Sequence, residues 1–251
     1  MKILKDINYS SKMLKECTLD AYLPDEVGCP IFIYIHGGGL VEGDKGKDGH
    51  RLSSYLASRG IGVVSLNYRM YPNAAYPDFI EDCTEGIKWV FDNLRDSNNK
   101  IFVGGSSAGA YISMMLCFNT EFLTSHGIHP SDISAYVHDA GQPTSHFNVL
   151  AEQGIDSRRI IVDDTAPLYY VGLEEKYPPM LFIWSDNDMP GRHEQLKLTL
   201  STIKAFGYDM SQVESIIRPG THVHYLHSHD DPDSFEFSSL IYPFLEKYSK
   251  N

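Results

Sequence analysis

A glycine-rich pentapeptide with two adjacent serines, GSSAG at residues 105–109, joins an apolar run to a helix-compatible run. A G-x-S-x-G turn between a strand and a helix exposes the central serine hydroxyl at the carboxyl edge of a sheet. The following helix would direct free N–H groups and a positive field toward that hydroxyl. The spacing differs from that of dinucleotide-binding turns, and no Walker lysine follows. We therefore expect Ser107 to be a nucleophile, and the competing interpretation is a tight turn without chemistry.

A second glycine-rich stretch, HGGG at residues 36–39, also follows an apolar run. Residues without side chains let backbone N–H groups approach a developing oxyanion, where fixed donors stabilise the negative charge. A flexible loop and a phosphate nest are the alternative interpretations of this stretch alone. We expect His36 to brace the loop by hydrogen bonding and not to transfer protons.

A serine hydroxyl becomes a strong nucleophile only when a base takes its proton, and the base needs an orienting carboxylate. In hydrolases with a G-x-S-x-G turn the acid and then the histidine follow the serine along the chain. The stretch SDND after residue 184 supplies Asp186 and Asp188, although either could instead cap the next helix. The candidate histidines are His222, His224, His227 and His229. No cysteine or H-E-x-x-H pattern accompanies them, so we expect no metal site, and we expect His227 and His229 to be solvated.

These residues require a scaffold of alternating strands and helices, which the apolar pattern predicts. Near-continuous β-branched and aromatic runs are typical of strands buried on both faces. The expected strands cover 17–24, 30–39, 62–69, 100–105, 133–141, 179–186 and 212–220. The expected helices cover 48–60, 76–94, 108–117, 192–207 and 233–248. The first strand alternates apolar and polar residues and is expected to be antiparallel.

This alternation predicts an α/β protein with a mostly parallel sheet and helices on both faces. The length of 251 residues suits a single domain, 1–251. The segment 142–166 interrupts the rhythm, and long connections of this kind are often lids.

The composition narrows the classes of partner. A net charge of −12 disfavours nucleic acid and anionic membrane surfaces, and no apolar stretch is long enough for a membrane span. The start of the chain lacks the apolar core of a signal peptide, and the four scattered cysteines form no C-x-x-C pair. We expect a cytoplasmic protein without structural disulfides.

Four motifs in the expected chain order resemble those of the α/β-hydrolase serine esterases, specifically the hormone-sensitive-lipase-like enzymes. They are HGGG at 36–39, GSSAG at 105–109, YPPMLFIWSDNDMP at 177–190 and GTHVHYL at 220–226. The stretch NYRMYPNAAYPDFIEDCTEGIKWV at 67–90 also resembles a stretch of this family. The resemblance covers about residues 17–248 and implies an α/β-hydrolase fold. About sixteen residues precede the first expected strand, too few for the N-terminal cap of larger members, as in short bacterial acetyl and carbohydrate esterases.

The resemblance implies a role for each residue. Ser107 would be the nucleophile, His222 the base, with His224 as the alternative, and Asp188 the acid. In the family the acid comes three residues after a small turn residue, and Ser185 fills that position. Asp186 would instead close an Asx-turn on the N–H of Asp188, while Pro190 opens the next helix. The oxyanion donors would be the N–H groups of Gly38, Gly39 and Ala108.

The implied function is hydrolysis of small carboxylic esters, with short acetyl-like acyl groups, without a cofactor or metal. Tyr169, Tyr170 and His146 are candidates for lining the leaving-group site. An amide hydrolase such as an arylformamidase or peptidase remains an alternative, because the same constellation serves several acyl transfers. A catalytically inactive hydrolase fold that binds a ligand is the alternative outside enzymes.

Overall fold

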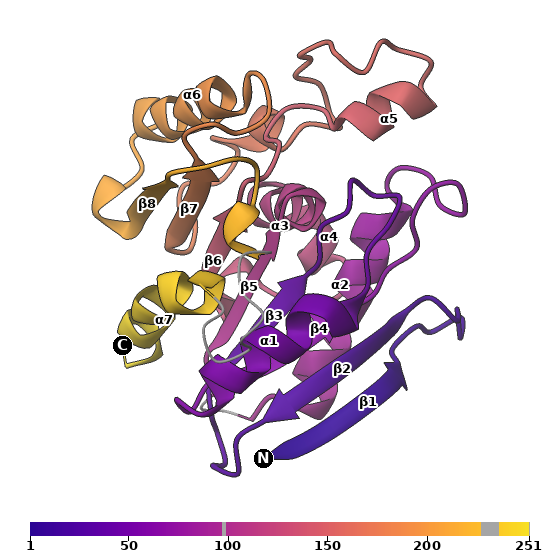
Figure 1. The fold of residues 1–251 in the computed structure, drawn as a ribbon, viewed down its shortest axis with the longest axis vertical. Coiled ribbons are helices and arrows are strands. Elements are labelled where there is room, and N and C mark those ends of the chain that lie inside the picture. The colour runs from indigo at the N-terminus through magenta and orange to yellow at the C-terminus, as the bar shows by residue number, and fades with distance from the viewer. Residues whose placement is uncertain (97–98, 227–235, 251) are drawn as a thin grey trace.

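The apolar runs form the strands of an eight-stranded sheet in the computed structural model, which describes residues 1–96, 99–226 and 236–250. The strand order is β1-β2-β4-β3-β5-β6-β7-β8. Strand β2 is antiparallel to β1 and β4, and the remaining neighbours are parallel (Figure 1). The strands are β1 Lys2–Asn8, β2 Thr18–Leu23, β3 Ile31–Ile35, β4 Gly62–Leu66, β5 Ile101–Ser106, β6 Ile133–Asp139, β7 Met180–Ser185 and β8 Val213–Arg218.

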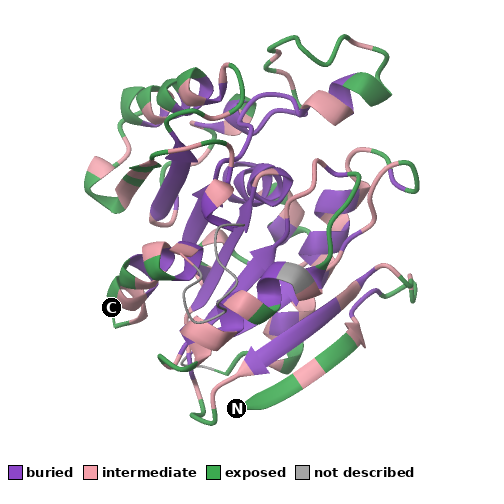
Figure 2. Ribbon diagram, in the orientation of Figure 1, coloured by how far each residue is buried: buried purple, intermediate pink, exposed green. Residues whose placement is uncertain are grey.

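Helices cover both faces of this sheet, and each face has its own hydrophobic cluster. Apolar side chains of α1 and α7 pack on one face, and those of α2, α3 and α6 pack on the other. The helices are α1 Lys45–Ala57, α2 Asp78–Asn93, α3 Ala108–Phe118, α4 Glu121–Thr124, α5 Phe147–Glu152, α6 Arg192–Ala205 and α7 Glu236–Ser249. Short 3-10 turns are η1 Pro130–Asp132, η2 Pro167–Tyr170, η3 Met210–Gln212 and η4 His224–Leu226. The central strands are buried on both faces (Figure 2), which explains their near-continuous apolar sequences.

The predicted α/β architecture is confirmed, with differences at its margins. The first strand is β1 and not 17–24, because the mostly exposed residues Lys2–Asn8 carry little apolar pattern. Strand β3 ends at Ile35, so the HGGG stretch lies in the loop beyond it. Helix α6 begins at Arg192, after Gly191 in a left-handed conformation, so Pro190 precedes the helix and does not open it.

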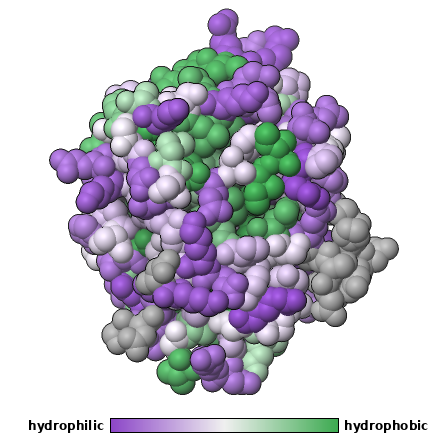
Figure 3. All heavy atoms as spheres, turned by 90° about the vertical axis from the view of Figure 1, so that its left-hand side faces the viewer, coloured by the Kyte–Doolittle hydropathy of each residue, from purple (hydrophilic) through white to green (hydrophobic). Residues whose placement is uncertain are grey.

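The other edge of the sheet is β8, on the side of the molecule seen in Figure 3. Hydrophobic residues gather near the middle of this view, with hydrophilic residues around them. Leu198 in α6, Phe206 beyond it and Ile217 in β8 are exposed. Separately, within the described residues, no helix combines the length and apolarity needed to cross a membrane.

Candidate active site

Ser107 lies in a sharp turn between β5 and α3. Its backbone φ is +54°, and its N–H donates to the carbonyl of Asp139 at 2.7 Å. The two glycines of the motif allow close packing here. A Cβ at Gly109 would lie 2.0 Å from the carbonyl oxygen of Ile35, and one at Gly105 would lie 2.5 Å from the same atom. The G-x-S-x-G pattern is therefore required by the contact of this turn with β3.

A continuous chain of hydrogen bonds links the serine, histidine and aspartate that the sequence predicted. The Nε2 atom of His222 lies 2.9 Å from Ser107 Oγ, and its Nδ1 atom lies 2.6 Å from Asp188 Oδ1. Because the carboxylate accepts, the Nδ1–H must donate, and Nε2 is left to accept the serine hydroxyl proton. Asp188 follows β7 and His222 follows β8, so three strands bring these residues to one edge of the sheet.

The environment keeps Asp188 ionised. Burial alone would raise its pKa, because the side chain is only 1% exposed. The hydrogen bond and charge of His222, with the N–H of Met189 at 2.6 Å, outweigh burial and hold the pKa of Asp188 below its usual value. A negative charge is therefore available to orient the imidazole and to stabilise its protonated form.

The alternative candidates for the acid and the base make other contacts or lie outside the described residues. The Asp186 carboxylate accepts the Gly220 N–H at 2.9 Å, which ties the loop after β7 to the loop after β8. The expected Asx-turn on Asp188 is therefore replaced by this contact. The His224 ring lies 3.3 Å from the carbonyl of Thr221 and makes no bond to Ser107. His227 and His229 lie outside the described residues.

Gly38 and Gly39 line the same cavity as Ser107, and Ala108 follows Ser107 in the chain. Gly38 and Gly39 have φ values of +108° and +63°, and a Cβ on Gly38 would lie 1.9 Å from the Glu42 carbonyl oxygen. In the part of the chain that the structure describes, neither N–H donates to a protein acceptor. Ala108 is the first residue of α3, where an N–H has no acceptor within its own helix.

His36 holds the glycine loop in place. Its buried ring stacks on Tyr68 with 4.5 Å between centroids, and its Nδ1–H donates to the Gly37 carbonyl at 2.7 Å. The Tyr68 hydroxyl donates to the carbonyl of His36 at 2.9 Å. Burial lowers the pKa of His36 to about 4, so the ring is neutral at physiological pH. These contacts agree with a bracing role.

Ser107, His222 and the glycines at 37–39 line one cavity of about 530 Å³. Phe147 and Asn148 of α5 and Met189 line it as well, whereas Tyr169, Tyr170 and His146 do not. The prediction that those three residues line this site is wrong for this cavity: His146 is buried and caps α5, and the Tyr170 hydroxyl donates to the carbonyl of Asp164 at 2.8 Å. Phe147 and Asn148 were missed because only their place in the long connection 142–166 marks them.

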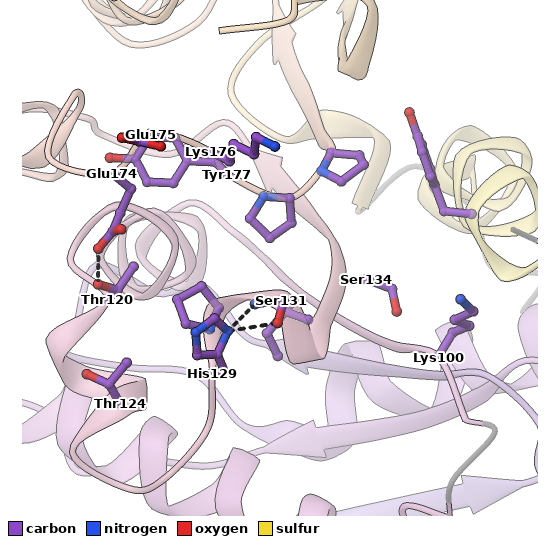
Figure 4. Close-up of a pocket in the computed structure, with 15 residues that line it drawn as sticks. Lys100, Thr120, Thr124, His129, Ser131, Ser134, Glu174, Glu175, Lys176 and Tyr177 are labelled. Carbon is purple, nitrogen blue, oxygen red and sulfur yellow. Dashed lines mark hydrogen bonds between the residues drawn. The ribbon is translucent and has the colours of Figure 1, made fainter.

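A larger cavity of about 820 Å³ lies at the opposite end of the parallel strands from Ser107, next to the amino ends of β5, β6 and β7 (Figure 4). Thr120 donates to Glu174 there at 2.6 Å, and His129 bonds Ser131 at 2.7 Å. The cavity holds no serine–histidine–carboxylate chain and lies far from the chemistry described above. No group of three potential metal ligands occurs among the described residues.

Comparison with known proteins finds partial sequence matches to esterases. The family model BD-FAE matches residues 19–126, which contain both glycine-rich motifs. Esterase LipC of Mycobacterium tuberculosis is 33% identical over 212 residues, which are 76% of this chain and 52% of LipC. Esterase LipI of the same organism is 33% identical over 96 residues, 37% of this chain and 30% of LipI. The chain thus spans at most about half the length of these relatives.

Solved structures show the same fold at low identity. Esterase B from Lactobacillus rhamnosis has a TM-score of 0.79 at 18% identity, with 99% of this chain and 86% of that chain covered. A truncated carbohydrate esterase from gut microbiota has a TM-score of 0.77 at 20% identity, with 100% and 97% covered. The sheet topology and these structural matches show that the chain has the α/β-hydrolase fold, and over the matched residues it is similar to esterases.

Proposed function

We propose that this protein hydrolyses carboxylic esters through an acyl-enzyme on Ser107, with His222 as the base and Asp188 as the orienting acid. The observation that carries the proposal is the unbroken hydrogen-bond chain from Ser107 Oγ through His222 to Asp188. The esterase relatives support the same reaction class.

In the proposed reaction, Ser107 Oγ attacks the ester carbonyl while His222 Nε2 takes its proton. The N–H groups of Gly38, Gly39 and Ala108 stabilise the oxyanion, because they are fixed donors that need no reorganisation as charge develops. The imidazolium then protonates the leaving alcohol. A water molecule activated by the same histidine hydrolyses the acyl-enzyme.

We also propose a preference for short acyl groups. The cavity of about 530 Å³ is lined by Glu42, Asp44 and Asn148 as well as by apolar residues, and these polar side chains would disfavour a long alkyl chain beside them. The segment 142–166 would serve as a cover of this cavity. Two contacts would hold it: Asn148 donates to the carbonyl of Gly39 at 2.5 Å, and Glu152 accepts the Tyr71 hydroxyl at 2.5 Å.

The decisive experiment measures turnover of 4-nitrophenyl esters from acetate to palmitate, with a matched 4-nitroanilide to compare amide cleavage. The short esters should react fastest, and the anilide should react more slowly.

Ser107→Ala should lower ester turnover by roughly 10⁴–10⁶, as the loss of a triad nucleophile does elsewhere. A fluorophosphonate should label Ser107, with Ser106→Ala as the matched control that retains labelling. Labelling at Ser106, or faster palmitate than acetate turnover, would contradict the corresponding proposal.

A further inference from the structure

Arg192, at the start of α6, is a buried cation. The residue is only 4% exposed, and one terminal nitrogen donates to the carbonyl of Ala140 at 3.0 Å. The other lies 3.5 Å from Gln142 Oε1 and 3.9 Å from Met189 Sδ. A guanidinium carries five N–H donors, so these contacts leave capacity unused. Among the described residues, Arg192 forms no ion pair, although the charge of Asp188 acts on it from a greater distance.

An unpaired buried charge is costly, and buried cations in proteins usually have an anionic partner. Burial lowers the pKa of Arg192 to about 10, against a smaller opposing effect of the Asp188 charge. The group still carries its charge at neutral pH. The structure therefore contains a desolvated cation that an anion would stabilise.

The guanidinium borders a cavity of about 350 Å³ next to the candidate active site. Phe147 and Met189 line both this cavity and the one that contains Ser107, so the two adjoin. The remaining lining residues include Gln142, Arg158, Arg159 and Gln195. Arg158 is engaged by Asp156 at 2.6 Å, whereas Arg159 is exposed and makes no ion pair with a described residue.

We propose that this cavity is a subsite for a carboxylate carried by the ester substrate, with Arg192 as its principal ligand and Arg159 at its rim. The inference rests on the proposed esterase function. The planar guanidinium suits a carboxylate because two parallel N–H donors match its two oxygens. The net charge of −12 makes the chain as a whole repel anions, so such a substrate must be recognised locally.

A purely structural role is the competing explanation for Arg192, because its bond to Ala140 supports a residue with a φ of +52°. The two explanations differ in one measurable quantity. A structural arginine affects charged and neutral substrates alike, whereas a carboxylate ligand affects the ratio of their kcat/KM values.

The test uses two substrate pairs. In the acyl-side pair, 4-nitrophenyl hemisuccinate is compared with its neutral methyl ester. In the alcohol-side pair, 4-acetoxybenzoate is compared with 4-acetoxybenzamide. The native protein should prefer the charged member of at least one pair by about tenfold or more, as expected for hydrogen bonds to a charged group. The pair that shows the preference identifies the side of the ester that enters the subsite.

Variants then show which arginine causes the preference for the charged substrate. Arg192→Gln should reduce the charged-to-neutral ratio to about one, mainly through KM, and Arg192→Lys should retain part of it. Arg159→Gln, an exposed site that cannot be confused with a folding defect, should lower the ratio severalfold. Arg59→Gln, two residues beyond the C-terminal end of α1, is the matched control and should leave the ratio unchanged. Equal turnover within both pairs in the native protein, or an unaltered ratio in the Arg192→Gln and Arg159→Gln variants, would overturn the inference.

Failure of the esterase proposal would be recognised separately, because then no ester of either pair would react. In that case calorimetric titration of the native protein with succinate tests the subsite directly. Salt-sensitive binding that is lost in the Arg192→Gln and Arg159→Gln variants would support the anion site, and absence of binding to the native protein would exclude it.

Discussion

At the scale of single residues, the candidate site depends on a serine held in an unfavourable backbone conformation. A φ of +54° is uncommon for a residue with a side chain and persists only where neighbouring contacts impose it. The bond from the Ser107 N–H to the Asp139 carbonyl is one such contact. The hydroxyl is thereby presented to His222, which is the function of such a turn.

The two aspartates after β7 provide a matched pair of variants. Asp188→Asn should lower kcat by roughly 10⁴, because an amide opposite Nδ1 favours the wrong imidazole tautomer. Asp186→Asn should affect stability more than rate, because the Asp186 carboxylate accepts the Gly220 backbone N–H, whereas Asp188 contacts His222. Steady-state kinetics with an acetyl ester and thermal melting measure both effects. Loss of turnover in Asp186→Asn with normal turnover in Asp188→Asn would transfer the role.

The two described histidines allow a similar comparison. His222→Ala should abolish most ester turnover, since it removes the only imidazole in contact with Ser107 among the described residues. His224→Ala should retain most of it, because that ring contacts the Thr221 carbonyl. Burst kinetics would show whether acylation itself is lost in each variant. An inactive His224→Ala beside an active His222→Ala would refute the assignment.

At this scale the motif residues were predictable, because G-x-S-x-G, HGGG and the acid and histidine stretches each carry a local signature. The burial of Arg192 was not predictable, because an arginine at the start of a largely polar helix gives no sign of burial. Its environment arises from Ala140 and Gln142, which are distant in the sequence and lie beside it only in the folded chain.

At the scale of elements, the contact between α3 and β3 sets the position of the serine. Gly109→Ala should cost about 3 kcal/mol of folding free energy or more, because its Cβ would lie 2.0 Å from the Ile35 carbonyl oxygen. Ala110→Gly in the same helix is the opposite change and should cost less, about 2 kcal/mol, through helix propensity and the loss of one buried methyl group. Urea denaturation measures both. Equal losses would show that the close approach is not what requires Gly109.

The sequence predicted the elements best where they are buried. Strands β3 to β7 are buried and mostly apolar in sequence, whereas β1 was missed because pairing with β2, and not burial, defines it. Helix α1 begins at Lys45, three residues before the expected start, because Asp44 accepts the Gly46 N–H at 2.6 Å. That cap lies in a stretch rich in glycine and lysine, where helical periodicity is hidden.

At the scale of the whole molecule, a buried carboxyl group connects the sheet to the loop that carries His222. Asp139 ends β6 and accepts a hydrogen bond from the Tyr225 hydroxyl of η4, the short turn that follows His222 in the chain. The side chain is fully buried, and its second oxygen has no partner among the described residues. Burial raises the pKa of Asp139 to about 7, with smaller contributions from the charges of Asp188 and Asp48.

This raised pKa predicts how global stability depends on pH. In the unfolded chain an aspartate loses its proton near pH 4, whereas folded Asp139 keeps it until about pH 7. The folded state therefore binds more protons between these values, and the contribution of Asp139 to stability falls as pH rises through this window. The amide introduced by Asp139→Asn cannot ionise, yet its oxygen can still accept the Tyr225 hydroxyl. The unfolding free energy of Asp139→Asn minus that of the native protein should therefore rise from pH 4 to pH 8, by at most about 4 kcal/mol.

Urea denaturation of both proteins at pH 4, 6 and 8 measures this difference, with the slope m checked for constancy. Tyr225→Phe is the complementary variant. The hydroxyl of Tyr225 lowers the pKa of Asp139 by donating to its charged form, so its removal should extend the pH window upward. A difference between Asp139→Asn and the native protein that does not change with pH would mean that Asp139 is already ionised in the folded state. Its charge would then be stabilised by the Tyr225 hydroxyl strongly enough to offset burial.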